Sequence, residues 1–375
     1  MLRKSRLFVL PFLMLPILST TVSCGNDNKL LILNWGEYIN DDIVAKFEEE
    51  YDCEVSISIA DSNELFYSKI KAGTTAYDLV VPSEYMVKKM KEQDLLEKLD
   101  LSRIESFSQE DYLPGVQGIE NEMVNNYGFE EFKEYQVPYF WGTFGIMYSK
   151  TKPGVEEAIK ENGWNALFDK SLLPSGSTTG MYNVPRFAYS ASLFHLGYEN
   201  PNVVGNKYLE EVKKDFLKAN FNQWGTDDLK KKVAKGDLDA AYVYTGDYLD
   251  MYYQETSSDV NYDIYIPSNT IAFMDSFVMP KKARHKDLAY EFINYFTKPE
   301  NAYENASIIG YCTTRKTTYN MILESGDETW ANAIEKCYPL PDETWTKPYQ
   351  GVPLDTMDKN YLTKISNTIN DVKVG

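Results

Sequence analysis

The sequence predicts an α/β protein built from two lobes, and three features lead to this prediction. Apolar runs and amphipathic patterns alternate from residue 29 to about residue 96, as strands and helices do in a parallel sheet covered by helices. A long extended aromatic run follows at 137–150, and a second alternating region occupies the middle of the chain. Two further extended runs at 262–280 carry the chain back, so we expect a hinge that closes two lobes on a ligand.

The first lobe begins with three strand-and-helix pairs. Asn40 and Ser62 have the chemistry of helix N-caps, and Gly73 has that of a helix end. The apolar run at 77–83 is continuous, as in a strand that is buried on both faces of a parallel sheet. Strands are expected at 29–34, 54–60 and 77–83, and helices at 41–51, 62–73 and 84–96.

The second half of the chain repeats this alternation. Helices are expected at 188–196, at 226–234 and from about 247, and a strand at 238–244. Two more helices, separated at Pro299, follow the returning runs. We expect lobe 1 to hold residues 29–141 and 271–320, and lobe 2 to hold residues 142–270. The C-terminal helices at 321–375 are not assigned, because they can pack on one lobe or bridge both.

The N-terminus has the pattern of an export signal. Residues 1–23 begin with basic side chains, continue as a short apolar run and end in small residues, as a secretory signal peptide does. The ending resembles a bacterial lipobox, although Thr21 stands where that motif prefers Leu. We expect lipid on Cys24, a tether over 24–28, and membrane contact through this lipid alone, on the outer face of the cell membrane or in the periplasm. Plain cleavage near Ser23 is the alternative.

Composition narrows the classes of partner. The chain has 38 basic and 56 acidic side chains, a formal net charge of −18. It therefore repels phosphate backbones and anionic lipid, so we expect no nucleic-acid partner, whereas a cationic ligand is compatible. The chain also has 29 Tyr, a residue that often lines ligand clefts because it joins an apolar face to a polar group. We expect a monomer.

Little in the sequence points to catalysis. The two histidines, His195 and His285, lie in no metal-binding spacing, and no nucleophile, phosphate-binding or dinucleotide-binding motif occurs. A catalytic pair of carboxylates stays open from one sequence, but nothing singles one out. We expect neither an enzyme nor a metal or cofactor.

The cysteines after Cys24 do not form a disulfide framework. Cys53, Cys312 and Cys337 make no C-x-x-C pair, and an odd number cannot all pair within one chain. Buried free thiols are expected, and a bridge between Cys312 and Cys337 is left open.

Aromatic and acidic residues recur together where predicted strands end. In open α/β sheets, ligands bind beyond the carboxyl ends of the strands. The residues at these ends are Trp35, Glu37, Tyr38, Ser83, Tyr85, Tyr244, Asp247, Phe273 and Asp275. An organic ammonium has three donors that need carboxylate or carbonyl acceptors, and an aromatic face attracts it by roughly 0.5–2 kcal/mol. Each acid alone could be a helix cap, but their recurrence indicates a site for a cationic ligand.

Seven segments between residues 33 and 315 resemble one known family. In chain order they read LNWGEYI, DSNELFYSKIKAG, YDLVVPSEYMVKKM, VPYFWGTFGIMY, AYVYTGD, FMDSFVMP and IIGYCT. They look like the spermidine/putrescine-binding proteins of bacterial polyamine ABC transporters. The resemblance implies a type II periplasmic-binding-protein fold, capture of a polyamine between two lobes, and delivery to a membrane permease driven by a cytoplasmic ATPase.

The resemblance also implies roles for individual residues. Trp35 and Tyr38 form an aromatic wall with Glu37 as an amine acceptor, and Asp275 is the central amine anchor. Ser83, Tyr85, Tyr244, Asp247, Phe273 and Tyr311 line the same cleft, and Gln350 matches a late ligand-contacting Gln in a looser alignment.

The far wall of the expected cleft departs from the family pattern. Where family members carry acids for a terminal amine, this chain has Asn183, Val184 and Phe187. Tyr244 and Phe273 also replace Trp, which is the better cation–π partner. The identity of the amine therefore stays open. A sugar, ferric iron or a sensor role without transport are alternatives, and Asp275 argues against the first two because neither needs a carboxylate beside Phe273.

Overall fold

The architecture is that of an α/β protein with two sheets, seen in a computed structural model that describes residues 28–105, 108–254, 260–340 and 351–374. The predicted signal peptide, Cys24 and Gln350 lie outside these residues. The strands are β1 (Lys29–Asn34), β2 (Glu54–Ile59), β3 (Leu79–Val80), β4 (Val137–Ser149), β5 (Thr179–Tyr182), β6 (Gln223–Gly225), β7 (Ala240–Tyr244), β8 (Tyr262–Tyr265), β9 (Ala272–Phe277) and β10 (Cys312–Thr313).

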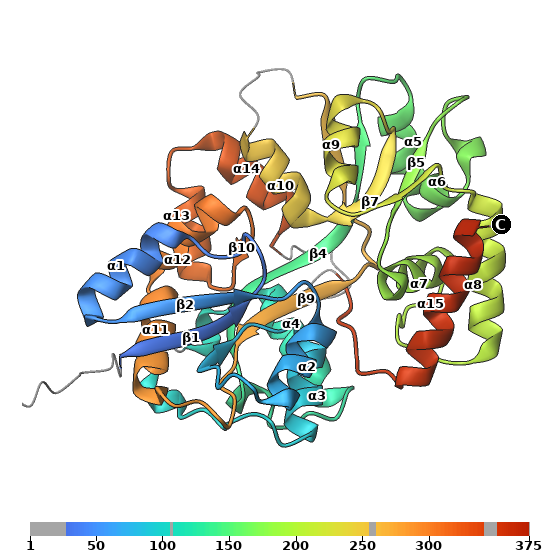
Figure 1. Cartoon of the computed structure of the whole chain (residues 1–375). Coiled ribbons are helices and arrows are strands. Elements are labelled where there is room, and N and C mark those ends of the chain that lie inside the picture. Colours follow the sequence, from blue (N-terminus) through green and yellow to red (C-terminus); the bar gives the residue numbers. More distant parts are fainter. Residues whose placement is uncertain (1–27, 106–107, 255–259, 341–350, 375) are drawn as a thin grey trace, which may run out of the picture.

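Helices cover both sheets (Figure 1). They are α1 (Asp41–Tyr51), α2 (Asn63–Ala72), α3 (Glu84–Glu92), α4 (Pro114–Asn125), α5 (Val155–Asn162), α6 (Trp164–Phe168), α7 (Pro185–His195), α8 (Asn206–Ala219), α9 (Asp228–Lys235), α10 (Thr245–Gln254), α11 (Lys286–Thr297), α12 (Pro299–Ile309), α13 (Lys316–Leu323), α14 (Glu328–Cys337) and α15 (Lys359–Val374).

The N-terminal elements follow the local signals of the sequence. Asn40 caps α1 through its side chain, and Ser62 caps α2 by accepting from the Leu65 backbone N–H at 3.3 Å. Gly73 ends α2 with φ of 62°, a left-handed conformation that costs glycine little. β3 is shorter than the predicted strand at 77–83, although the backbone N–H groups of Asp78 and Val81 on either side of it still donate to Leu31 and Leu33 of β1.

One sheet forms the core of what we call lobe 1. β1 lies between β2 and β3, and all three run parallel. Antiparallel bridges then join the segment around β3 to β9, where Val80 pairs with Val278 and Ser83 pairs with Asp275. β9 in turn pairs with the first half of β4, which also pairs with β10. Lobe 1 therefore draws strands from both ends of the chain.

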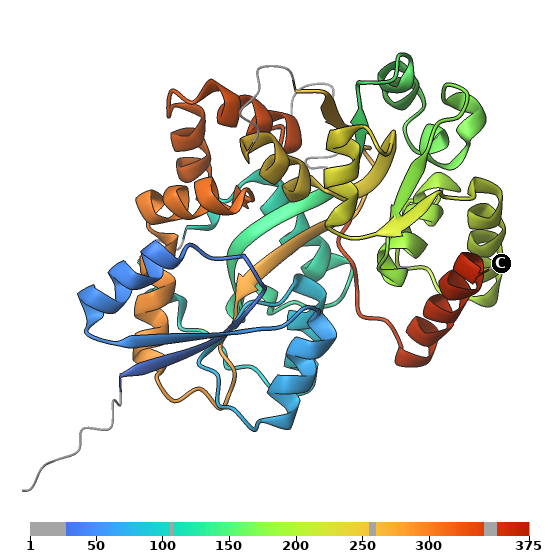
Figure 2. The same ribbon diagram turned by 45° about the horizontal axis from the view of Figure 1, so that its top comes forward.

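The seven-stranded sheet, to which β4, β9 and β10 also belong, continues into lobe 2 and forms its core. The second half of β4 pairs antiparallel with β7 and β8, and β5 lies between β7 and β6 in parallel. Every residue of β4 is buried, so this single strand is a shared spine for both lobes. Figure 2 shows β4 running through the centre of the molecule with β9 beside it.

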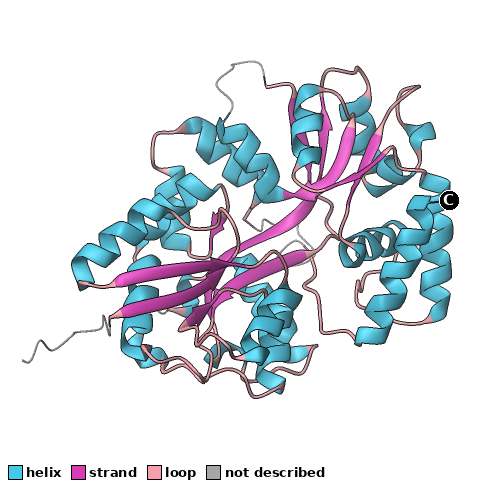
Figure 3. Cartoon of the chain, viewed as in Figure 1, coloured by secondary structure: helices cyan, strands magenta, loops and turns pink. Residues whose placement is uncertain are grey.

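The C-terminal part of the chain touches both lobes. α14 packs against α10 of lobe 2 and against α13, whereas α15 packs on α7 and α8 of lobe 2. Between them, the Val352 backbone pairs with Ile271 just before β9, so the chain passes between the lobes at a third place. Figure 3 shows this stretch as a loop that leads into the last helix. The sequence predicted that the chain crosses between the lobes twice, and it left residues 321–375 unassigned.

Candidate functional site

The centre of the site is the buried carboxylate of Asp275 on β9. Its Oδ2 accepts a hydrogen bond from the Tyr38 hydroxyl at 2.9 Å, and its Oδ1 accepts one from the Ser83 hydroxyl at 2.6 Å. Tyr38 follows β1 and Ser83 precedes α3, so the three side chains come from three distant segments. Only 4% of Asp275 is exposed. They meet because antiparallel bridges join β9 to the segment around β3, which lies beside β1.

The surrounding side chains hold this group in place. Asn63, the first residue of α2, donates to the Ser83 hydroxyl at 2.9 Å and accepts from the Ser83 backbone N–H at 3.0 Å. Glu84 accepts from the Met274 backbone N–H at 2.9 Å, which ties α3 to β9. Burial raises the pKa of Glu84 to about 8, so this carboxyl is mainly protonated at neutral pH and adds little negative charge beside Asp275.

Asp275 carries a charge that the described part of the chain does not neutralise. Burial raises its pKa to about 6, and the bonds from Ser83 and Tyr38 lower it only in part. Among the described residues, no Lys or Arg lies within ion-pair distance of this carboxylate. A shift of two pKa units corresponds to about 3 kcal/mol against the charged form. A bound cation would remove this cost.

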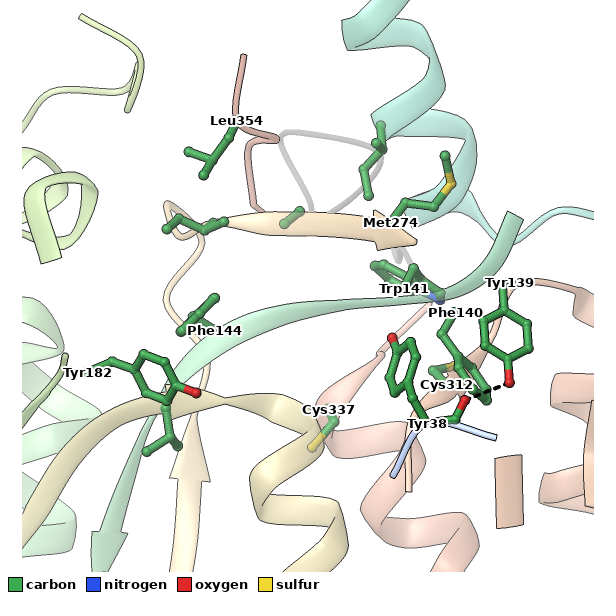
Figure 4. Close-up of a cluster of buried hydrophobic side chains, with 14 of the residues drawn as sticks. Tyr38, Tyr139, Phe140, Trp141, Phe144, Tyr182, Met274, Cys312, Cys337 and Leu354 are labelled. Carbon is green, nitrogen blue, oxygen red and sulfur yellow. Dashed lines mark hydrogen bonds between the residues drawn. The ribbon is translucent and has the colours of Figure 1, made fainter. Parts of the chain in front are cut away.

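The backbone of Tyr38 is also held in place by hydrogen bonds. The Tyr139 hydroxyl donates to the Tyr38 carbonyl oxygen at 2.7 Å, and Asn305 donates to the Tyr139 hydroxyl at 2.8 Å. Figure 4 shows the hydrogen bond from Tyr139 to Tyr38, and the ring of Tyr38 beside Phe140. The turn before it places Glu37 at φ of 51°, a left-handed conformation. The ring of Tyr38 is therefore held beside Asp275 by a hydrogen bond to the Tyr38 carbonyl oxygen.

A continuous row of aromatic rings leads from Asp275 toward lobe 2. The ring centroids of Tyr38 and Tyr311 are 5.1 Å apart, those of Tyr311 and Phe273 6.3 Å, and those of Phe273 and Tyr244 5.3 Å. Beyond Tyr244 the row continues with Phe144 at 4.0 Å. We call Tyr38, Tyr311, Phe273 and Tyr244 the aromatic row. It offers faces and edges to an apolar chain that carries positive charge.

The acid of lobe 2 is in a different state. Asp247 lies in the first turn of α10, and its Oδ1 is 3.2 Å from Nζ of Lys230 on α9. Its Oδ2 accepts from the Tyr244 backbone N–H at 3.2 Å. Lys230 also contacts Asp250 at 2.8 Å. Burial raises the pKa of Asp247 to about 6, while Lys230 pulls it down. Asp247 is thus already paired with a cation of the chain itself.

The other predicted residues are placed in various ways. Trp35 donates from Nε1 to the Val81 carbonyl oxygen at 2.7 Å and packs on Phe66, so its indole is tied to lobe 1. Glu37 is exposed. Tyr85 is half-buried on α3. Gln350 and Cys24 are outside the described residues, so their predicted roles stay predictions.

The segment at 183–187, which departs from the family pattern, contributes packing to the aromatic surface of lobe 2. Phe187 lies 5.0 Å from Phe144 and 5.9 Å from Tyr244, between ring centroids, so it extends the aromatic surface of lobe 2. Asn183 is exposed and accepts from Lys373 of α15. The segment at 183–187 contains no acid, and the ring of Phe187 packs there against Phe144 and Tyr244.

Sequence reasoning missed several residues of the site. Asn63 and Lys230 were read as ordinary helix residues, because each acts on a partner at least seventeen positions away. Tyr182 packs edge-on against Tyr244 at 5.1 Å, and a Tyr at the end of a strand was the signal that could have found it. The bridge left open between Cys312 and Cys337 does not form, and Cys53 is also a free thiol.

Comparison with known proteins bears out the predicted resemblance. A putrescine-binding periplasmic protein of Escherichia coli is 27% identical over 303 residues, covering 78% of this chain and 80% of that protein. A spermidine/putrescine-binding periplasmic protein of Salmonella typhimurium is 29% identical over 296 residues, covering 77% and 78%.

Solved structures agree in fold. The spermidine/putrescine ABC transporter substrate-binding protein PotD of Streptococcus pneumoniae superposes with a TM-score of 0.70 at 29% identity, covering 92% of this chain and 99% of that one. The TpPotD lipoprotein of Treponema pallidum gives a TM-score of 0.69 at 26% identity, with the same coverage. The predicted type II periplasmic-binding-protein fold is confirmed. Residues 42–335 match the profile of the bacterial extracellular solute-binding proteins, and the chain belongs to that family.

Proposed function

We propose that this chain captures a polyamine of the spermidine/putrescine class between its lobes and delivers it to an ABC importer. The observation that carries the proposal is Asp275, a buried carboxylate held by two hydroxyls beside the aromatic row. The chemistry of the named relatives, which bind putrescine or spermidine, supports the same ligand class.

The site suits an ammonium for physical reasons. An ammonium carries three donors, and Asp275 can accept a hydrogen bond from one of them. The ammonium would also offset the cost of keeping the Asp275 carboxylate charged in a buried position. The hydroxyls of Tyr38 and Ser83 can turn, so each can accept from the ammonium or keep donating to the carboxylate. The aromatic row then covers the methylene chain and attracts the charge by roughly 0.5–2 kcal/mol per contact.

A sugar or ferric iron would use these groups less well. A sugar can stack on aromatic faces, but it would leave Asp275 buried with a charge and no cation. Ferric iron is held by several converging oxygen ligands, whereas the two oxygens of Asp275 are bonded to Tyr38 and Ser83 and the nearby Asp247 is bonded to Lys230. The amine is therefore the better match.

Closure of the lobes would complete the site. β4 and β9 connect the two lobes, and Tyr244 of lobe 2 meets Phe273 of β9 at this junction. A ligand that touches both lobes stabilises the closed arrangement by its extra contacts there. The permease then recognises the closed form. The chain acts as a binding protein rather than an enzyme, and it releases the amine unchanged.

The proposed location follows from the N-terminal signal. We propose export, lipid attachment at Cys24 and action as a monomer at the outer face of the membrane or in the periplasm, as the relatives named periplasmic suggest. No helix in the described ranges is long and apolar enough to cross a bilayer.

Calorimetric titration of the purified protein with putrescine, spermidine, cadaverine, maltose and ferric citrate tests the ligand class. Tight binding of at least one amine, without a response to maltose or ferric citrate, is the expected result. No heat from any amine together with tight binding of the sugar or of iron would overturn the proposal.

A further inference from the structure

Lys230 is a largely buried cation at the lobe 2 end of the aromatic row, and the proposed function leaves it unexplained. Its side chain is 13% exposed, and its Nζ lies 3.2 Å from Asp247 and 2.8 Å from Asp250. Burial lowers the pKa of Lys230, but the two carboxylates raise it further, so the net shift is upward and the amine stays charged. The ammonium of Lys230 is therefore paired with Asp247, one of the predicted ligand-binding carboxylates.

The carboxylate that Lys230 occupies belongs to the same continuous surface as Asp275. Gly246 precedes Asp247, and a Cβ added at Gly246 would come within 2.2 Å of the Tyr311 ring. Tyr311 of lobe 1 therefore lies directly on the first turn of α10. Because Tyr311 also meets Tyr38, which donates to Asp275, one aromatic layer connects the two acids.

The two acids differ in the charge that they can offer a ligand. Asp275 is bonded by hydroxyls only, whereas Asp247 is paired with Lys230, which it shares with Asp250. The side chain of Asp250 is one-third exposed, so solvent screens the charge of this second partner of Lys230. The segment before α7 adds no acid. Lobe 2 therefore presents no unmatched buried carboxylate among the residues described.

We propose that Lys230 fills the amine position of lobe 2, so that the cleft takes a diamine in preference to a triamine. This inference rests on the proposed function. The diamine places one ammonium at Asp275, and its chain lies along the aromatic row. A triamine of greater length would bring a further ammonium toward Asp247, where the like charge of Lys230 repels it and no free carboxylate accepts it. Lys230 thus acts as a repulsive element that discriminates between ligands.

The test compares ligand preference, which a purely structural ion pair would not change. Wild-type protein and Lys230→Met are titrated with putrescine and with spermidine. We expect the wild type to bind putrescine at least about tenfold more tightly, and Lys230→Met to shift the affinity ratio toward spermidine by about tenfold or more, equivalent to about 1.4 kcal/mol.

Three further variants control for charge and folding. Lys230→Arg keeps the cation and should keep the wild-type preference. Lys232→Met removes a cation from the same helix, where Lys232 pairs with Asp228 away from the aromatic row, and should also keep it. Lys230→Gln retains amide donors for both carboxylates, so it tests the loss of charge if Lys230→Met does not fold.

The outcomes distinguish the proposed role of Lys230 from the proposed function of polyamine capture. A wild type that prefers spermidine, or a ratio that stays unchanged in both Lys230→Met and Lys230→Gln while amines still bind, overturns the role of Lys230 and leaves polyamine capture standing. A wild type and variants that bind neither amine overturn the proposed function itself.

Discussion

Two acids at the ends of one aromatic row are in opposite electrostatic states. Asp275 in lobe 1 is held by the hydroxyls of Tyr38 and Ser83, and no cation of the described chain reaches it. Asp247 in lobe 2 is held by Lys230 and by a backbone N–H. Burial raises the pKa of both to about 6. Similar burial therefore leaves one carboxylate available to a cationic ligand and the other already satisfied.

This difference suggests a division of labour between the lobes. Lobe 1 recognises charge, because its acid gains most from a bound ammonium. Lobe 2 supplies covering surface through Tyr244, Phe187 and Phe144, whose rings contact one another. A buried aspartate can thus have two roles, and its neighbours in space decide which.

The largest effect is expected from Asp275→Asn. The change keeps the shape and removes the charge, so amine affinity should fall at least about tenfold, near 1.4 kcal/mol. Calorimetry with putrescine measures this loss, and a thermal melt checks that the fold survives. Unchanged affinity in a folded variant would show that the anchor lies elsewhere.

Acidification should produce a loss of similar size. The pKa of Asp275 in the free protein is about 6, and an ammonium binds the charged form, so binding lowers this pKa and releases a proton. Affinity should be full above about pH 7 and fall about tenfold on going to pH 5. Titrations in buffers of different ionisation enthalpy measure the proton release near pH 6. In Asp275→Asn this pH dependence should be much reduced, and its persistence there would assign it to another group.

A smaller loss is expected from Asp247→Asn. Because Lys230 already neutralises Asp247, an amine gains little from its charge, and putrescine affinity should fall by only about threefold, near 0.7 kcal/mol. The same calorimetric titration measures it. A loss as large as that of Asp275→Asn would remove the distinction between the two acids.

The smallest change is expected from Tyr38→Phe. The ring remains against Tyr311, but the hydroxyl bond that lowers the pKa of Asp275 is lost, so this pKa rises. The midpoint of the affinity–pH curve should move upward by a few tenths of a pH unit. The pH series used for the wild type measures the shift. A downward shift would contradict the donor role of the Tyr38 hydroxyl.

Local signals in the sequence account for most of the fold. Asn40, Ser62 and Gly73 bound helices as predicted, since caps act on backbone groups within a few residues. The apolar alternation and the aromatic run of β4 specify strands for the same reason. Tyr38, which follows β1, could be recognised as a site candidate because strand ends meet at one edge of a sheet. Phe273 and Asp275 were also expected at a strand end, but they lie inside β9, so the strand-end rule did not place them correctly.

The tertiary structure alone decided which of those residues work together. Tyr38 and Asp275 are 237 positions apart, and Asp247 meets Lys230 across 17 positions and two helices, so no periodicity in the sequence encodes either pairing. It also decided that Glu37 is exposed and that α15 packs on lobe 2. The composition and the aromatic and acidic residues near the strands predicted a site for a cationic ligand. Whether Asp275 or Asp247 is free to pair with a cationic ligand depends on distances of about 3 Å to neighbouring side chains, and only the folded chain sets these distances.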